Sequence, residues 1–245
     1  MSGHSKWSNI KHRKGRQDAA RGKLFAKLIR AIESAARSGG TDPAANVTLA
    51  TAIQKARDAS VPRDTIDRAV ARGAGDLDGV HYEEIWYEGY ASGGVALYVQ
   101  VLTDNRNRAA SDVRAAFNKH DGSLGEPGSV GYLFEQKGYL LAEGDEETVM
   151  LAALDGGADD VRPSGDQWEV VTDPGHLGRV RAALEASGVA IADAEVTQLP
   201  VTTVAVDATG APKVLRLVDA LEDLDDVQAV YANFDIPDEV LADIG

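Results

Sequence analysis

The sequence contains no cysteine and no long apolar run. Disulfides, thiolate metal sites and cysteine nucleophiles are therefore excluded. No stretch approaches the roughly 18 apolar residues of a membrane span, and the opening residues MSGHSKW lack the apolar core of a secretory signal. The absence of cysteine also fits a reducing compartment, so these features together predict a cytoplasmic protein that does not bind membranes.

Recognisable catalytic and cofactor motifs are also missing. No nucleophile motif of the GxSxG type occurs, and neither Gly-rich segment matches a P-loop or a dinucleotide fingerprint. The five histidines form no metal-binding spacing on one helix face; they are His4, His12, His81, His120 and His176. These absences predict no cofactor and no metal site, and no catalytic residue is assigned.

What the sequence does contain is a strong division of charge. Residues 1–75 carry 15 Lys and Arg against 6 Asp and Glu, residues 76–245 carry 10 against 33, and the whole chain has a net charge of −14. A polyanion would be attracted to the first part of the chain and repelled by the remainder. This division predicts that the N-terminal region binds nucleic acid.

The first 21 residues combine many cations with only two large apolar side chains, Trp7 and Ile10. Clustered charge without apolar residues contributes little to folding and attracts phosphate strongly, so we expect a tail that a polyanion orders. Trp7 either stacks on an unpaired base or pins the tail to its own domain. The predicted tail contacts are Lys6, Trp7, Lys11, His12, Arg13, Lys14, Arg16 and Arg21.

The next segment, Gly22–Ser38, has the period of an amphipathic helix. Its apolar stripe consists of Leu24, Phe25, Leu28, Ile29, Ile32, Ala35 and Ala36. Lys23, Lys27 and Arg30 lie in an arc on the opposite side, together with Arg37. Such an arc is either a solvated face or an extension of the phosphate-binding surface, and we include Lys23, Lys27 and Arg30 in the predicted site.

Two shorter helices are expected to complete a small bundle. Asp42 or Asn46 can cap the first of them, and the second spans Arg63–Arg72 with Gly73 as its terminator. Arg68 and Arg72 on this helix either extend the basic surface or are solvated or ion-paired.

The segment TDNRNR, residues 103–108, lies where a predicted strand gives way to a helix. Asp104 or Asn105 can cap that helix without any further function. Two arginines at a helix start oppose the helix dipole, so Arg106 and Arg108 require an anionic partner. We include both arginines as a second predicted contact with RNA or DNA.

Two other segments have open interpretations. The Gly-rich run GSLGEPGSVG, residues 122–131, is either a set of turns or a binding surface. The acidic run 219–226 is expected to be a solvated helix end, although it could instead keep the later domains away from nucleic acid or bind a basic protein.

The order of elements predicts an α+β protein. Strands are expected at Glu84–Tyr90, Val95–Thr103 and Val130–Phe134. From Gly138 the pattern becomes βαββαβ, which is typical of the ferredoxin-like fold. The last strand and helix can rejoin the sheet that begins at Glu84, but the pattern leaves that pairing open.

Several long motifs resemble the YebC family, which includes the mitochondrial translational activator of cytochrome c oxidase. The motifs are GHSKWSNIKHRK, RGKLFAKLIRAIESAARSGG, VPRDTIDRAVARGAG, YEGYASGG, LTDNRNR and GSLGEPGSVGYLFEQKG. The resemblance spans the chain and is densest in residues 3–137. Val47 and Ala91-Ser92 depart from the usual pattern only at a helix start and a turn.

The resemblance implies a protein that is not an enzyme and that has a YebC-like three-domain architecture. The expected domains are a basic helical domain at 1–76, an α+β domain at 77–136 and 204–245, and a ferredoxin-like α+β domain at 137–203 inserted in it. The family includes DNA-binding transcriptional regulators and proteins that associate with ribosomes.

We therefore predict a regulator of gene expression that binds DNA or ribosomal RNA through its phosphates. One alternative is a ribosome-associated translation factor that relieves stalling at consecutive prolines. A second is a magnesium-dependent enzyme acting on branched DNA, and a third is a scaffold whose acidic domains bind a basic protein.

Overall fold

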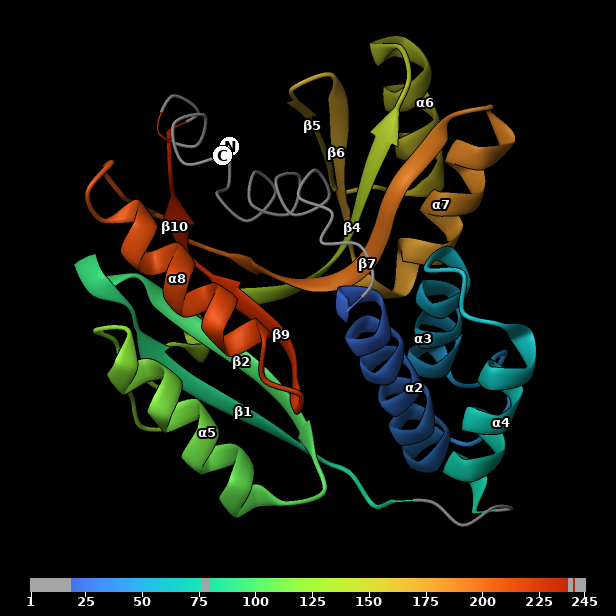
Figure 1. Ribbon diagram of the computed structural model, residues 1–245. Helices are drawn as coiled ribbons and strands as arrows, with labels where there is room; N and C mark the ends of the chain where they lie inside the picture. Colours follow the sequence, from blue (N-terminus) through green and yellow to red (C-terminus); the bar gives the residue numbers. More distant parts are fainter. Residues whose placement is uncertain (1–18, 76–79, 238–239, 241–245) are drawn as a thin grey trace.

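The computed structural model of the chain describes residues 19–75, 80–237 and 240 (Figure 1). The elements form three groups: a helical bundle, a first sheet carrying two helices, and a second sheet carrying two helices, whose elements lie in the sequence between the two parts of the first sheet. The predicted α+β class is confirmed.

The bundle consists of α2 (Ala19–Gly39), α3 (Val47–Asp58) and α4 (Arg63–Ala74). Ile32, Ala35 and Ala36 of the predicted stripe are buried between these helices, whereas Leu24 at the start of the stripe is 47% exposed. Asn46 caps α3, because its side chain accepts a hydrogen bond from the Leu49 N–H at 3.0 Å.

The prediction that Gly73 ends the third helix is wrong. The helix continues through Gly73, where α4 packs so closely on α2 that an added Cβ would lie 2.5 Å from the carbonyl oxygen of Glu33. Gly75 ends the helix instead, with φ at 86°, a left-handed conformation that glycine adopts without strain.

The first sheet has the strand order β3-β1-β2-β9. Its strands are β1 (Glu83–Tyr90), β2 (Ala96–Thr103), β3 (Ser123–Leu124) and β9 (Val227–Ala232). The helices α5 (Arg106–Lys119) and α8 (Ala211–Glu222) cover one face, and the main apolar core lies between them and the sheet (Figure 1). Antiparallel pairing of β9 with β2 brings the end of the chain back to the sheet that began at β1.

The second sheet has the order β5-β6-β4-β7, in which all neighbouring strands are antiparallel. It comprises β4 (Phe134–Glu143), β5 (Asp160–Ser164), β6 (Gln167–Thr172) and β7 (Ala190–Pro200). The helices α6 (Glu146–Gly156) and α7 (Leu177–Ala186) pack against it. This is the strand order that the βαββαβ pattern produces in a ferredoxin-like unit.

Short elements connect the larger ones. They are the 3-10 turns η1 (Ser92–Gly94), η2 (Gly131–Leu133) and η3 (Pro174–His176), and the parallel strand pair β8 (Val204–Ala205) and β10 (Phe234–Asp235). The prediction of a strand at Val130–Phe134 is wrong, because η2 occupies most of this segment and β4 begins at its last residue.

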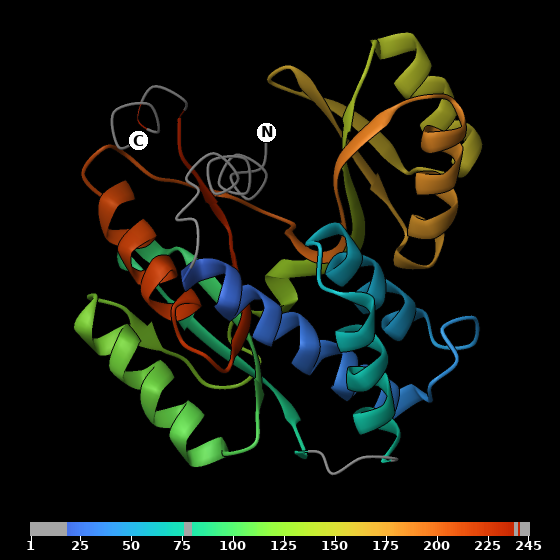
Figure 2. The ribbon, with the colours of Figure 1, turned by 45° about the vertical axis from the view of Figure 1, so that its right-hand side comes forward.

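The bundle contacts both sheet units. After a 45° turn of the view, α2 crosses in front of the first sheet, between α8 and the other two bundle helices (Figure 2). On the opposite side of the bundle, two ion pairs connect α3 to the second sheet unit. The Lys55 ammonium of α3 lies 2.5 Å from the Glu195 carboxylate of β7, and the Arg181 guanidinium of α7 lies 3.1 Å from the Asp58 carboxylate. No described helix has both the length and the apolar character needed to cross a bilayer.

Candidate nucleic-acid interface

Most of the predicted tail contacts lie outside the described residues. These are Lys6, Trp7, Lys11, His12, Arg13, Lys14 and Arg16, and the side chain of Arg21 lies outside them as well. Their assignment to nucleic acid stays a prediction.

The cations of α2 face the far end of α8, about 200 residues away in the sequence. Lys23 donates a hydrogen bond to the Asp223 carbonyl oxygen at 3.0 Å, and Lys27 donates one to the Glu222 carbonyl oxygen at 2.7 Å. Arg30 donates to the carbonyl oxygen of Asp225, and its guanidinium lies 3.6 Å from the Asp226 carboxylate. The acidic run is thus solvated only in part. The side chains of Asp219, Asp223 and Asp225 are exposed, as expected, whereas the main chain of the run lies against α2 and the Asp226 side chain is 12% exposed.

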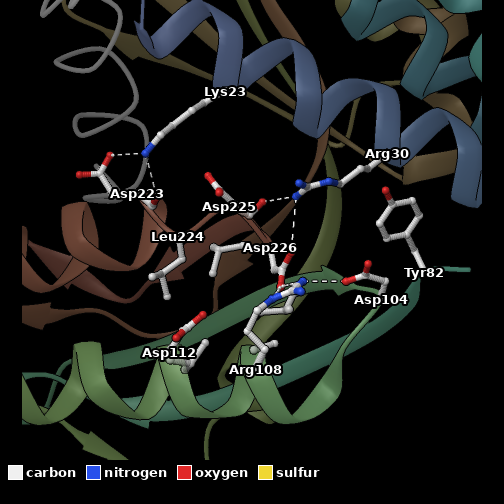
Figure 3. A pocket seen from close by; sticks show the side chains of 14 residues that line it. Lys23, Arg30, Tyr82, Asp104, Arg108, Asp112, Asp223, Leu224, Asp225 and Asp226 are labelled. Carbon is white, nitrogen blue, oxygen red and sulfur yellow. Dashed lines mark hydrogen bonds and ion pairs between the residues drawn. The ribbon is translucent and has the colours of Figure 1, made fainter. Parts of the chain in front are cut away.

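The Lys23 and Arg30 part of this contact forms one wall of a cavity between α2 and the first sheet unit (Figure 3). The cavity has a volume of about 790 Å³. Lys23 and Arg30 extend from α2, and Arg108 extends from α5 toward the same acidic turn. Carboxylates also line the cavity, so its walls carry both signs of charge; they belong to Asp104, Asp112, Asp223, Asp225 and Asp226.

Arg108 is held within the first sheet unit. Its guanidinium lies 2.8 Å from the Asp226 carboxylate and 2.7 Å from that of Asp104, one helical turn before it. The hydrogen bond from Arg108 holds the pKa of the Asp104 carboxyl below its usual range. The anionic partner that this arginine required is thus present in the chain itself.

Arg106 lies closer to solvent. Its side chain is 70% exposed and its guanidinium is 3.5 Å from the Glu83 carboxylate, a separation at which an exposed pair contributes little. Asn105 caps α5 by accepting a hydrogen bond from the Arg108 N–H at 3.1 Å, so one of the two predicted caps is observed. Arg106 therefore remains accessible to a phosphate at the start of α5.

Arg37 and Arg72 surround the buried acid of the bundle. The Arg72 guanidinium lies 2.9 Å from the Glu33 carboxylate, and Arg37 contacts His81 and the Arg72 carbonyl oxygen. Burial raises the pKa of Glu33, and Arg72, Arg37 and Arg30 oppose that rise. Of the two interpretations of Arg72, the ion-paired one therefore holds.

The other arginine of this helix, Arg68, donates a hydrogen bond from its side chain to the Asp64 carbonyl oxygen at 3.1 Å.

The Gly-rich loop binds a carboxylate that the sequence interpretation missed. Glu88 of β1 accepts hydrogen bonds from the N–H groups of Gly128 at 2.7 Å, Val130 at 2.5 Å and Gly131 at 2.8 Å. Burial raises the pKa of Glu88, but the N–H donors, led by that of Val130, outweigh burial and lower it overall. The sequence held one signal for this contact: Glu88 is a charged residue inside a predicted strand, where it needs hydrogen-bond donors, and a Gly-rich loop can supply N–H groups.

The described residues contain no group of three or more histidine and acidic side chains arranged to hold a metal ion. The charged arrangement that bears on the predicted interface is the contact between the α2 cations and the end of α8.

Two family models match the chain. One, for the N-terminal domain of TACO1/YebC proteins, matches residues 5–76. The other, for the TACO1/YebC second and third domain, matches residues 82–234. Together they cover the bundle and both sheet units.

Close relatives and a solved structure agree with these matches. A probable transcriptional regulatory protein of Rubrobacter xylanophilus is 57% identical, with 100% of this chain and 99% of the relative covered. Another probable transcriptional regulatory protein, from Acidothermus cellulolyticus, is 56% identical, with full coverage of both chains. The crystal structure of a conserved hypothetical protein from Aquifex aeolicus is 49% identical with a TM-score of 0.82, over 91% of this chain and 94% of that one.

Proposed function

The chain belongs to the TACO1/YebC family, and from this premise we propose that it is a regulator of gene expression that binds nucleic acid through the phosphate backbone. It is not an enzyme in this proposal, and it needs no cofactor or metal. Full-length relatives that are called probable transcriptional regulatory proteins support the regulatory role.

The observation that carries the proposal is the segregation of charge. In a chain of net charge −14, the first 75 residues hold 15 of the 25 Lys and Arg. On α2 the cations Lys23, Lys27 and Arg30 point away from the bundle core and toward oxygen ligands. A face that binds carbonyl and carboxylate oxygens has the chemistry needed for phosphate oxygens.

We infer that the basic tail and α2 form the main contact and that Arg106 forms a second one. Phosphate contacts supply affinity and carry little sequence information. The described bundle offers cations to the ligand, and we therefore expect weak discrimination between duplex sequences.

A salt titration tests the proposal. If about five phosphates are neutralised, log K against log salt should fall with a slope of roughly −4 on duplex DNA. The measurement is fluorescence anisotropy with a labelled duplex and, in parallel, a labelled ribosomal RNA fragment. A flat salt response for both ligands would contradict phosphate binding.

A deletion strain separates transcription from translation. Pauses at consecutive prolines with unchanged messenger levels in ribosome profiling would favour action on the ribosome. Altered messenger levels from promoters that the protein occupies would favour transcription, which is the role named in the bacterial relatives.

A further inference from the structure

We propose that the acidic end of α8, residues 222–226, is an internal competitor for nucleic acid that occupies the cations of α2 until a polyanion displaces it. The inference rests on the proposed function, because it describes how the same surface is regulated.

The end of α8 presents oxygen acceptors to the α2 cations, as the backbone of a nucleic acid would. Lys23 and Lys27 each donate to a main-chain carbonyl oxygen, at 3.0 and 2.7 Å, and Lys23 lies 3.8 Å from the Asp223 carboxylate. Arg30 donates to the carbonyl oxygen of Asp225, and its guanidinium lies 3.6 Å from the Asp226 carboxylate. Three successive cations of one helix face therefore hold a row of negative oxygens, as they would hold the oxygens of a nucleic-acid backbone.

The sequence of α8 makes this segment unfavourable by itself. The carboxyl end of a helix carries partial negative charge, and acidic side chains there are destabilising. Here Asp219, Glu222 and Asp223 lie in or beside the last turn of α8, and Asp225 and Asp226 follow directly. The cations of α2 compensate this concentration of negative charge.

The outer part of the contact, at Lys23 and Asp223, is weak enough for a polyanion to displace, whereas the Arg30 and Asp226 side chains at its inner end are only 22% and 12% exposed. The Lys23 and Asp223 side chains are 50% and 78% exposed, and exposed pairs of this kind contribute about 1 kcal/mol or less each. A nucleic acid that neutralises several cations gains additional free energy because it releases its own counterions. The acidic turn after α8 and a nucleic acid would therefore compete for the cations of α2.

Asp226 differs from the exposed acids of the turn. Its side chain is 12% exposed and accepts hydrogen bonds from Thr103 and Arg108 of the first sheet unit, so it also supports the turn itself. Asp223 and Asp225 are exposed, and their removal tests the competition without disturbing this support. A lysine at position 223 also suits the helix end, where positive charge is favourable.

The experiment compares D223K/D225K with D155K/D166K. The control variant changes the net charge by the same amount at two exposed acids of the ferredoxin-like unit. Affinity for the labelled duplex and the RNA fragment is measured by anisotropy at one salt concentration. If the closed contact holds about nine tenths of the molecules, D223K/D225K should bind about tenfold more tightly than the control.

A second readout follows the contact without nucleic acid. Because the chain has no cysteine, dyes can be attached only at introduced A44C in the bundle and K213C at the start of α8. Energy transfer between them should fall in D223K/D225K, stay unchanged in D155K/D166K, and fall in the otherwise unaltered protein when duplex is added.

The outcomes separate the two proposals. Equal affinity of D223K/D225K and its control, with wild-type binding intact, overturns the competition alone. Unchanged energy transfer in D223K/D225K also overturns it. If no variant binds either nucleic acid, the proposed function is wrong, and the contact then has no regulatory role. The energy transfer still shows, in that case, whether the acids hold α8 against the bundle.

Discussion

Arg30 of α2 and Arg108 of α5 bind the same carboxylate, that of Asp226, from two different domains. Asp226 lies 3.6 Å from the Arg30 guanidinium and 2.8 Å from that of Arg108, and it also accepts a hydrogen bond from the Thr103 hydroxyl at 2.8 Å. One carboxylate thus links the bundle to the first sheet unit.

We expect D226A to destabilise the protein more than D225A does. Removal of the Asp226 carboxylate leaves the Thr103 hydroxyl and two guanidinium groups without their shared acceptor, at a cost of about 2–3 kcal/mol. Because the Asp225 side chain is exposed, D225A should cost no more than about 0.5 kcal/mol. Urea unfolding followed by tryptophan fluorescence measures both, and equal stability of the two variants would contradict the assigned role.

Glu88 should make stability depend on pH in the acid range. Because its folded-state pKa is lowered, the stabilisation is fully present above the unfolded value of about 4.5 and is lost as the pH falls through the folded-state pKa. E88Q should cost about 1–3 kcal/mol at pH 7, since the amide keeps one acceptor and places an NH₂ group against N–H donors.

The control for Glu88 is E84Q on the same strand, because the Glu84 side chain is exposed and bonds to Gln100. Urea unfolding between pH 3 and pH 7 should show the gap between wild type and E88Q narrowing toward low pH. If the difference in unfolding free energy between wild type and E88Q stayed constant with pH, the N–H groups would not depend on the charge of Glu88.

Local signals predicted much of the fold. Asn46 and Asn105 were among the expected caps, and both are observed because capping depends only on a side chain and the next few N–H groups. The ferredoxin-like strand order followed from the βαββαβ pattern in the same way. The strand expected at Val130–Phe134 failed because the N–H groups of Val130 and Gly131 bind Glu88.

The contact between α2 and the end of α8 could not be read from the sequence. An arc of cations has the same local pattern whether it faces water, a phosphate chain or an acidic turn of the same protein. Lys27 and Glu222 are 195 residues apart, and only the folded arrangement of the two units shows that they meet. The predicted tail residues stay a prediction, because they lie outside the described part of the chain.

Gly73 should tolerate no side chain. G73A places a Cβ 2.5 Å from the Glu33 carbonyl oxygen and 2.7 Å from the Ala36 side chain, so α2 and α4 must separate at an expected cost of about 1–3 kcal/mol. G22A in α2 is the matched control, since its added Cβ has no atom within 4 Å apart from its chain neighbours and the backbone of its own helix. That change should stabilise the helix by about 0.5–1 kcal/mol. Thermal unfolding that ranks G73A above G22A would contradict the close packing.

The basic tail should govern affinity and leave stability unchanged. K11E/K14E removes two cations from a segment with few apolar residues, so the slope of log K against log salt should become less steep by about 2, and binding should be lost at moderate salt. The matched control, K119E/K213E, makes the same charge change at two exposed lysines of α5 and α8. Melting temperature and anisotropy are measured for both variants. If the two lose affinity equally, net charge rather than the tail determines binding, and a large drop in melting temperature for K11E/K14E alone would show that the tail lysines support the fold.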